Sequence, residues 1–294
     1  MAITLNQIAE ICGVSRGTVD RALHNKGNVR PAVAERIKAV ATEYGYTPNR
    51  AGLALSRASH PIRIGVIMFS VQTPFMQIVL DAARREARRL AAFSVEVIFR
   101  LSPSLDPVEQ VSMIENISAL AITPLDCLLV ETKINELIDQ RGIPVVTFNT
   151  DLPNSRRLCY VGQENISSGR TVAELMRLVT RESGTVATII TPCMYHSAYR
   201  ERLKGFKEEL LTPDSPLQLQ EVTLPNDDSN VVYEHTLRLL QETPELTGIY
   251  AITPGYAGAC SALVDSGRAR GVHLIMHDEI PANLYELRRG VADF

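Results

Sequence analysis

The chain has 294 residues and a formal net charge of −3, which is enough length for two or three domains. The charge is unevenly distributed, because residues 1–60 carry eight Lys and Arg against four Asp and Glu, leaving 22 basic and 29 acidic residues in the remainder. A basic head on an acidic body favours a protein whose first segment meets phosphates and whose bulk does not. The apolar runs have strand length, so the pattern predicts neither a signal peptide nor a membrane span.

The stretch Thr4–Asn25 has the pattern of two short helices joined by a tight turn at Gly13. Thr4 and Gln7 have the spacing of a capping box, and Ser15 suits the N-cap of the second helix. An ordinary helical hairpin in a core would show the same pattern. The face of the second helix that we expect to be exposed, however, carries Arg16, Gly17, Thr18 and Arg21. This layout is typical of a helix-turn-helix, whose second helix enters the major groove of DNA.

A third helix follows, with Pro31 at its first position and Gly45 just past its end. Its apolar stripe would close a three-helix domain with the first two helices. Residues 46–59 then read as a connector. The fragment 49–56 is too short for a stable isolated helix, so it is either a flexible linker or a segment that folds only when held.

From Ile62 onward, apolar strand-like runs alternate with amphipathic helices. The pattern predicts strands at 62–68, 94–100, 127–131, 143–149, 158–162, 185–191, 217–224, 248–253 and 272–276. It predicts helices at 74–92, 106–121, 133–141, 165–180, 198–211, 230–242, 257–266 and 282–289. Such alternation indicates parallel sheets covered by helices on both faces, here in two α/β lobes with a boundary near 160–164. Residues 290–294 resemble the start of another strand, so we expect the natural chain to continue.

Three patterns occur in one order: the helix pair over 8–25, the segment 29–55 with its GYTPN sequence, and the α/β body beginning IRIGVIM. Together they resemble the lactose-repressor (LacI/GalR-type) family of transcriptional regulators, whose body is similar to periplasmic binding proteins of type I. The resemblance implies a helix-turn-helix domain, a hinge, and two Rossmann-like parallel-sheet lobes that bind an effector, the second lobe being incomplete. These domains would cover residues 1–47, 48–60, 61–162 and 163–294.

The resemblance also implies a function. It predicts a non-enzymatic homodimeric repressor that binds palindromic operator DNA in the bacterial cytoplasm, at the nucleoid. A small-molecule effector, a carbohydrate or a derivative of one, would control its operator affinity as either inducer or corepressor. No cofactor, catalytic residue, metal site or membrane partner is expected. The five cysteines (Cys12, Cys127, Cys159, Cys193 and Cys260) are widely spaced in apolar stretches, and we expect free thiols in a reducing compartment.

Residue by residue, the resemblance assigns DNA contacts to Thr4, Ser15, Arg16, Gly17, Thr18, Arg21, Asn25, Tyr46 and Leu55. Arg16 suits guanine, because a guanidinium donates two hydrogen bonds to O6 and N7. Leu55 matches a leucine that relatives insert into the minor groove to kink the duplex. Two departures are Gly17, which lacks a side chain for base reading, and Asp20, an acid that is unfavourable beside DNA unless it pairs with Arg16 or Arg21.

Ligands of such folds lie in the crevice outside the carboxyl ends of the strands. That rule and the resemblance assign effector contacts to Phe75, Asn149, Asp151, Arg200, Thr253 and Asp278. Asn, Asp and Arg side chains bond hydroxyls, and an aromatic ring packs on the C–H face of a sugar. Each residue also has a plain structural reading as a turn residue, a surface charge or a core residue. The sequence Thr253-Pro254-Gly255 replaces a frequent Asn-Asp pair, which argues against a simple ribose or galactose specificity.

The two alternative classes are an enzyme and a transporter's solute-binding protein. An enzyme is disfavoured because the chain lacks the GxGxxG, P-loop and HExxH patterns. His273 and His277 straddle a predicted strand and its end, so they do not share the helix that would align them on a metal. A transporter's solute-binding protein fits the body but not the helix pair. Deleting residues 1–60 separates these readings, since operator binding should vanish while ligand binding persists.

Overall fold

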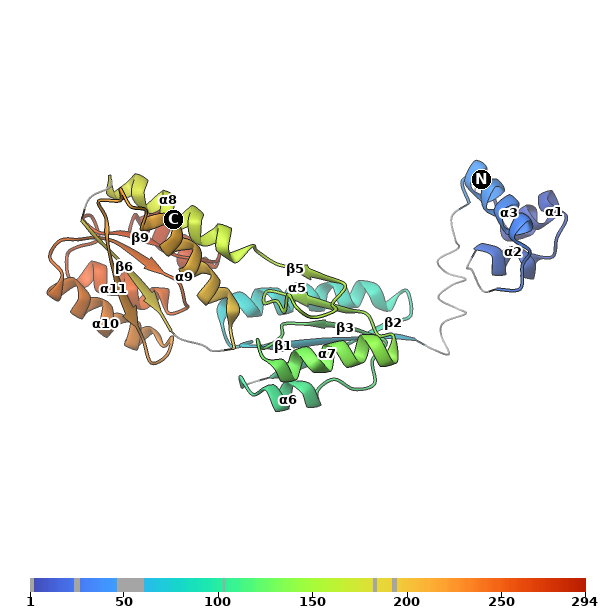
Figure 1. The fold of residues 1–294 in the computed structure, drawn as a ribbon, viewed down its shortest axis with the longest axis horizontal. Coiled ribbons are helices and arrows are strands. Elements are labelled where there is room, and N and C mark those ends of the chain that lie inside the picture. Colours follow the sequence, from blue (N-terminus) through green and yellow to red (C-terminus); the bar gives the residue numbers. More distant parts are fainter. Residues whose placement is uncertain (1–2, 24–26, 47–60, 103, 182–183, 192–194) are drawn as a thin grey trace. The chain divides into compact units, whose positions relative to one another are not determined.

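The computed structural model describes residues 3–23, 27–46, 61–102, 104–181, 184–191 and 195–294. The chain divides into two compact units, one holding residues 1–61 with 92–94 and the other holding 62–91 and 95–294 (Figure 1). The predicted hinge at 48–60 lies outside the described residues. Among the described helices, none combines the length and apolar character that crossing a membrane requires.

The first unit contains three helices: α1 (Leu5–Cys12), α2 (Arg16–Leu23) and α3 (Pro31–Glu43). The predicted capping box is present, since Thr4 Oγ1 accepts from the Gln7 amide at 3.3 Å and Gln7 Oε1 accepts from the Thr4 amide at 2.9 Å. Gly13 ends α1 at φ 63°, a left-handed conformation that glycine adopts without steric cost. One fully buried side chain from each helix forms the centre of the core, namely Ile8, Val19 and Ile37.

The first lobe of the second unit is a five-stranded parallel sheet in the order β2-β1-β3-β4-β5. Its strands are β1 (Ile62–Phe69), β2 (Val95–Ser102), β3 (Ala119–Ile122), β4 (Val145–Phe148) and β5 (Cys159–Val161), and its helices are α5 (Pro74–Ala91), α6 (Pro107–Ser112) and α7 (Leu128–Arg141). Alternate residues of β1 enter two cores: Val66 and Met68 face α5, whereas Ile67 and Phe69 pack with the α7 side. This period of two is what a sheet buried on both faces requires.

The second lobe is a four-stranded parallel sheet in the order β7-β6-β8-β9. Its strands are β6 (Thr185–Ile190), β7 (Gln218–Thr223), β8 (Leu246–Ala251) and β9 (His273–Ile275), and its helices are α8 (Asn165–Thr180), α9 (Ser197–Leu210), α10 (Ser229–Glu242), α11 (Tyr256–Asp265) and α12 (Pro281–Arg289). Beyond β9, the Asp293 amide donates to Leu274 O at 2.8 Å and the Met276 amide donates to Phe294 O at 2.9 Å. The last residues therefore lie along β9 with strand-like hydrogen bonds.

Helices α8 and α9 pack closely because glycines stand at their crossing. A Cβ on Gly169 would lie 2.1 Å from Arg202 O, and a Cβ on Gly205 would lie 2.0 Å from Ile166 O. Neither position has room for any side chain. The close crossing fixes where α9 sits along α8, and so it positions the side chains at the start of α9.

The predicted fold class is confirmed, but two predicted elements of the first lobe are wrong. The helix predicted over 106–121 ends as α6 at Ser112, and residues 119–122 form strand β3 instead. The strand predicted at 127–131 is the first turn of α7, where Val130 is buried and Leu128 is 76% exposed. The apolar run Leu128–Val130 has strand-like composition, but only one of its residues faces the core, which is the pattern of a helix that begins there.

Candidate functional site

The exposed face of α2 carries a chain of polar contacts. Ser15 Oγ accepts from the Thr18 amide at 3.2 Å and lies 2.9 Å from Thr18 Oγ1. Arg21 Nη2 donates to Thr18 Oγ1 at 3.3 Å. Arg16, Gly17 and Arg21 are exposed, whereas Thr18 is half-buried. The face therefore presents two guanidinium groups and two hydroxyls, which are donors to phosphate and to base edges.

Two of the other predicted DNA contacts, Thr4 and Tyr46, lie among the described residues of the helical unit. Thr4 is exposed at the start of α1, where its side chain caps the helix. Tyr46 packs against the three-helix core, and its pKa is raised by burial and by the charge of Asp20, with an opposing effect from Arg16. Tyr46 thus lies in the electric field of α2. The predicted contacts Asn25 and Leu55 lie outside the described residues.

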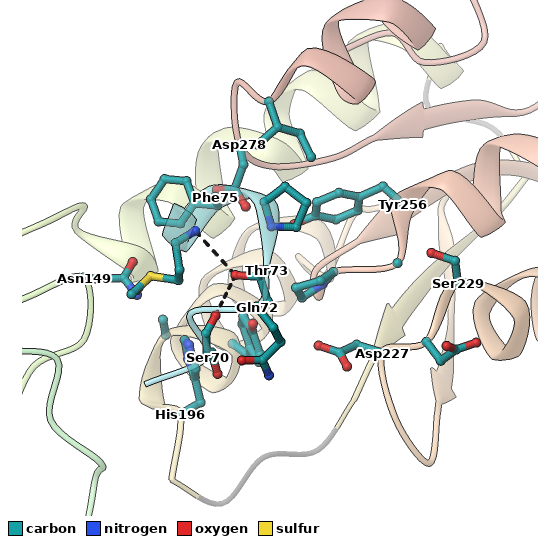
Figure 2. Close-up of a pocket in the computed structure, with 18 of the residues that line it drawn as sticks. Ser70, Gln72, Thr73, Phe75, Asn149, His196, Asp227, Ser229, Tyr256 and Asp278 are labelled. Atoms are coloured by element: carbon teal, nitrogen blue, oxygen red, sulfur yellow. Dashed lines mark hydrogen bonds between the residues drawn. The ribbon is translucent and has the colours of Figure 1, made fainter. Parts of the chain in front are cut away.

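A cavity of about 480 Å³ opens in the second unit, and both lobes contribute to its wall (Figure 2). Its polar lining comes from loops and helix starts of both lobes and from Arg202 of α9: Ser70, Gln72, Thr73, Ser104, Asn149, His196, Arg202, Asp227, Asp228, Ser229, Asp278 and Asn283. Aromatic rings of Phe69, Phe75, Tyr199 and Tyr256 complete it. This volume and mixture of ring faces with convergent polar groups are typical of a small-molecule site.

Three cavity residues that follow strands have left-handed backbones although none is glycine. They are Ser70 after β1 at φ 53°, Asn149 after β4 at φ 63°, and Asp278 beyond β9 at φ 72°. Such conformations are uncommon outside glycine and concentrate at functional sites. The backbone at Asp278 is fixed by its surroundings, because Asn283 Nδ2 donates to Asp278 O at 3.0 Å and to His277 O at 2.7 Å.

Helix α5 begins at the cavity and presents an aromatic ring to it. Thr73 Oγ1 donates to Ser70 O at 3.0 Å and accepts from the Met76 amide at 3.4 Å, so it caps the helix start (Figure 2). The following Pro74 suits the first helical position. Phe75, one of the predicted effector contacts, is thereby placed in the cavity wall, half-buried.

The start of α9 adds a buried imidazole. His196 stacks on Tyr199, with ring centroids 4.0 Å apart and planes 7° apart, and meets the Phe69 ring edge-on at 5.7 Å. Burial, together with the charges of Arg202 and Arg200, lowers the pKa of His196 to about 3. His196 is therefore neutral at physiological pH. Its buried Nδ1 has no hydrogen-bond partner among the described residues.

Arg202 is the cavity's cation. Its Nη2 donates to Gln163 Oε1 at 3.1 Å, while its buried Nε has no hydrogen-bond partner within the described part of the chain. The charge of Arg202 opposes the rise that burial causes in the pKa of Asp278, so the guanidinium and that carboxyl share one field. A buried polar atom without a partner costs free energy, and Arg202, like His196, contributes such an atom to the described part of the wall.

Two further carboxylates, besides Asp278, belong to the cavity wall. Asp227 and Asp228 precede α10, and Asp228 caps that helix by accepting from the Asn230 amide at 2.9 Å. Helices α5, α9, α10, α11 and α12 all place first-turn residues in the cavity wall. Their N-terminal dipoles partly offset the acidic charge. The wall is thus rich in both donors and acceptors, as ligands with many hydroxyls require.

Of the six predicted effector contacts, Phe75, Asn149 and Asp278 line the cavity, while the other three do not. Asp151 is held by Arg157, whose Nη2 lies 2.6 Å from Asp151 Oδ2, and by Thr147 Oγ1 at 2.6 Å. Thr253 is 2% exposed, and its Oγ1 accepts from the Thr191 amide at 3.3 Å. These two side chains have internal partners and support the strand ends.

Arg200 corrects the prediction most directly. It is exposed and pairs with Asp126 of the first lobe instead of entering the cavity. Arg202, two positions further along α9, lines the cavity instead. Its spacing of three residues from Gly205 can be counted in the sequence, but only the α8–α9 crossing shows that this glycine determines which arginine faces the cavity.

The remaining missed residues had no comparable signal. His196, Asp227, Tyr256 and Asn283 come from four separate segments of the second lobe and meet only in the folded chain. Each follows a strand or begins a helix, so position alone makes them candidates. Nothing in their local sequence separates them from other loop residues.

Comparison with known proteins is consistent with this architecture. Residues 4–49 match the family of bacterial regulatory proteins described as the lacI family, and residues 64–294 match the periplasmic binding protein domain. The chain belongs to the lacI family of bacterial regulatory proteins, with a periplasmic binding protein domain as its body. The two matches correspond to the helical unit and the two-lobed unit.

Individual relatives are distant. The chain is 29% identical over 221 residues to the HTH-type transcriptional regulator CelR of Thermobifida fusca, covering 71% of this chain and 61% of that protein, less than two thirds of its length. It is 26% identical over 297 residues to the HTH-type transcriptional regulator AglR of Rhizobium meliloti (strain 1021), covering 95% and 79%. A solved sugar-binding protein of a sugar ABC transporter from Bacillus halodurans superposes with a TM-score of 0.67 at 27% identity, covering 78% of this chain and 79% of that one.

Proposed function

We propose that this protein is a sequence-specific DNA-binding transcriptional regulator, a repressor, whose operator affinity is controlled by a carbohydrate bound in the cavity. The observation that carries the proposal is the face of α2, where Arg16 and Arg21 are exposed beside the hydroxyls of Ser15 and Thr18. Exposed guanidiniums on the second helix of a helix-turn-helix match the chemistry of phosphates and guanine edges.

In this proposal each copy of the chain reads one half-site. Arg16 donates to guanine O6 and N7, while Ser15 and Thr18 bond phosphates that fix the helix in the groove. Asn25 and Tyr46 contact the backbone, and Leu55 enters the minor groove between the half-sites. Because one helix reads only a few base pairs, a homodimer on a palindromic operator supplies the remaining specificity.

The cavity in turn takes a polyhydroxy ligand. Asn149, Asp278 and Arg202 supply amide, carboxylate and guanidinium groups from both lobes, and the rings of Phe75 and Tyr256 supply apolar faces. Hydroxyls both donate and accept, so one ligand can bond the Arg202 guanidinium and the Asp278 carboxyl together. A ligand that touches both lobes favours one lobe arrangement over another, and only that difference in affinity can change DNA binding.

Replacing Arg16 with Ala tests the DNA reading. The full chain is first used to select an operator from a random duplex library, and affinities are then measured for that operator and for single-base variants. Loss of a bidentate guanine contact should cost roughly 1–3 kcal/mol at one base pair and relax preference there alone.

The matched control is Arg36→Ala, which removes the same charge from α3. It should leave the base preference unchanged. If Arg16→Ala weakened all duplexes equally, Arg16 would be a phosphate contact, and if the wild-type chain selected no sequence, the proposed function would be wrong.

A further inference from the structure

The two lobes are joined by a three-residue connector. Strand β5 of the first sheet ends at Val161, and helix α8, which packs on α9 of the second lobe, begins at Asn165. Gly162, Gln163 and Glu164 lie between them. A change in the lobe arrangement therefore acts on the backbone near these residues.

Tyr160 attaches the connector to the cavity wall of the first lobe. Its hydroxyl lies 3.1 Å from Asn149 O and 3.1 Å from Gln163 O, so one proton is shared between a cavity residue and the connector. The ring folds back over Gly162, where a Cβ would lie 2.1 Å from the hydroxyl oxygen. Only glycine at 162 leaves the hydroxyl in this place.

Gln163 attaches the same connector to the cavity wall of the second lobe. Its Oε1 accepts from Arg202 Nη2 at 3.1 Å, and Arg202 lines the cavity. A path thus runs from Asn149 O through the Tyr160 hydroxyl to Gln163 O, and from there through the covalent bonds of Gln163 to its Oε1 and Arg202. Each end of the path touches the cavity, and its middle is the connector.

We propose that Tyr160 and Gln163 are positioning residues that couple the two cavity walls through the connector, so that a ligand held by Asn149 and Arg202 acts on the lobe arrangement through this path. The inference deepens the proposed function, because it names how the cavity would control the rest of the chain. Burial and the charges of Asp151 and Glu201 raise the pKa of Tyr160, which keeps its hydroxyl protonated and able to donate.

Coupling has a property that a local structural role lacks, namely that it is reciprocal. If the path couples the walls, then damage at Tyr160 must loosen the Arg202 side, and damage at Gln163 must loosen the Asn149 side. If the residues act only locally, each change loosens its own side alone. The two cases are separated by measuring both sides in each variant.

Hydrogen–deuterium exchange of the full-length, ligand-free chain makes that measurement. In Tyr160→Phe, peptides over the connector and over α9 should exchange about fivefold faster, the effect of losing one net hydrogen bond. In Gln163→Met, peptides over β4 and residues 149–151 should accelerate by a similar factor. The double variant should add little to either single change, because both interrupt one path.

Three controls sharpen the result. Tyr233→Phe removes a hydroxyl bonded to Asp265 at 3.0 Å within the second lobe and should change neither cavity wall. Gln163→Glu keeps an acceptor for Arg202 and should preserve wild-type exchange at Asn149, whereas Gly162→Ala should reproduce Tyr160→Phe. Because the exchange experiment uses neither DNA nor sugar, its result does not depend on whether the proposed function is correct. Acceleration confined to the mutated side, or additive effects in the double variant, would overturn the coupling.

Discussion

The face of α2 and the wall of the cavity both bring arginines together with hydroxyl groups, but in different surroundings. Arg16 and Arg21 are exposed on a short helix, where water and salt screen their charge. In the cavity, Arg202 has a buried Nε and shares its field with Asp278, His196 and His277. The same chemical group is therefore solvated and screened in one place and desolvated in the other, which suits the two proposed roles, contact with phosphates and bases on α2 and ligand binding in the cavity.

Salt should separate the two surfaces most strongly. If each copy neutralises about two phosphates through Arg21 and other basic side chains of its helical unit, a fourfold rise in salt should weaken operator binding by about a hundredfold. Sugar binding in the cavity should change by less than about twofold over the same range, because buried groups are little screened. Fluorescence anisotropy measures the affinity for the selected operator. Calorimetry measures the affinity for a carbohydrate ligand, namely the member of a panel of D-galactose, D-arabinose and D-gluconate that most stabilises the chain. Operator affinity independent of salt would contradict the DNA reading of α2.

Two arginines of α9 give the next largest effect, since they differ in exposure but not in chemistry. Arg202→Met removes the buried donor and should weaken sugar binding by about ten- to a hundredfold, as expected for a hydrogen bond to a charged group. Arg200→Met breaks an exposed ion pair with Asp126 and should change sugar affinity by less than about threefold. Calorimetry with the same sugar compares both variants with the wild type. Equal losses would mean that the cavity wall described above is not the binding site.

This pair of arginines also shows how far sequence alone reaches. Local rules predicted the capping box at Thr4 and Gln7, the helix pair and the two parallel sheets, because each depends on residues a few positions apart. The cavity depends on segments from Ser70 to Asn283 that meet only after folding. Phe75, Asn149 and Asp278 were predicted because position after a strand is itself a local signal. Arg200 was preferred to Arg202, although Arg202 lines the cavity, because burial at the α8–α9 crossing, which fixes the register of α9, is a tertiary fact.

The predictions of two secondary-structure elements in the first lobe were wrong for a related reason. Residues 119–122 form a strand that is too short and too rich in alanine to stand out from a preceding helix, and it is stabilised by pairing with β1 and β4. Residues 128–130 have the composition of a buried strand, yet Leu128 and Leu129 are exposed. In both cases neighbours in space, not propensity, decided the outcome.

The free energy of unfolding should depend on pH, because the imidazole of His196 is desolvated in the cavity wall. The pKa of His196 is lowered to about 3 by burial and by two nearby arginines. Its neutral form is therefore favoured in the folded chain, and the resulting stability is complete above the unfolded pKa near 6.5 and is lost as pH falls. At pH 5 the loss from His196 should be about 2 kcal/mol. Urea unfolding of the wild type and of His196→Gln at pH 7 and pH 5 should show a smaller drop in the variant.

His235→Gln provides the comparison for that measurement, because His235 lies on α10 and does not line the cavity. It should retain the wild-type drop in unfolding free energy between pH 7 and pH 5. A drop in His196→Gln as large as that of the wild type would show that water reaches the imidazole. In that case the floor of the cavity would be solvated like the face of α2, and the contrast between the two arginine-bearing surfaces would lose its physical basis.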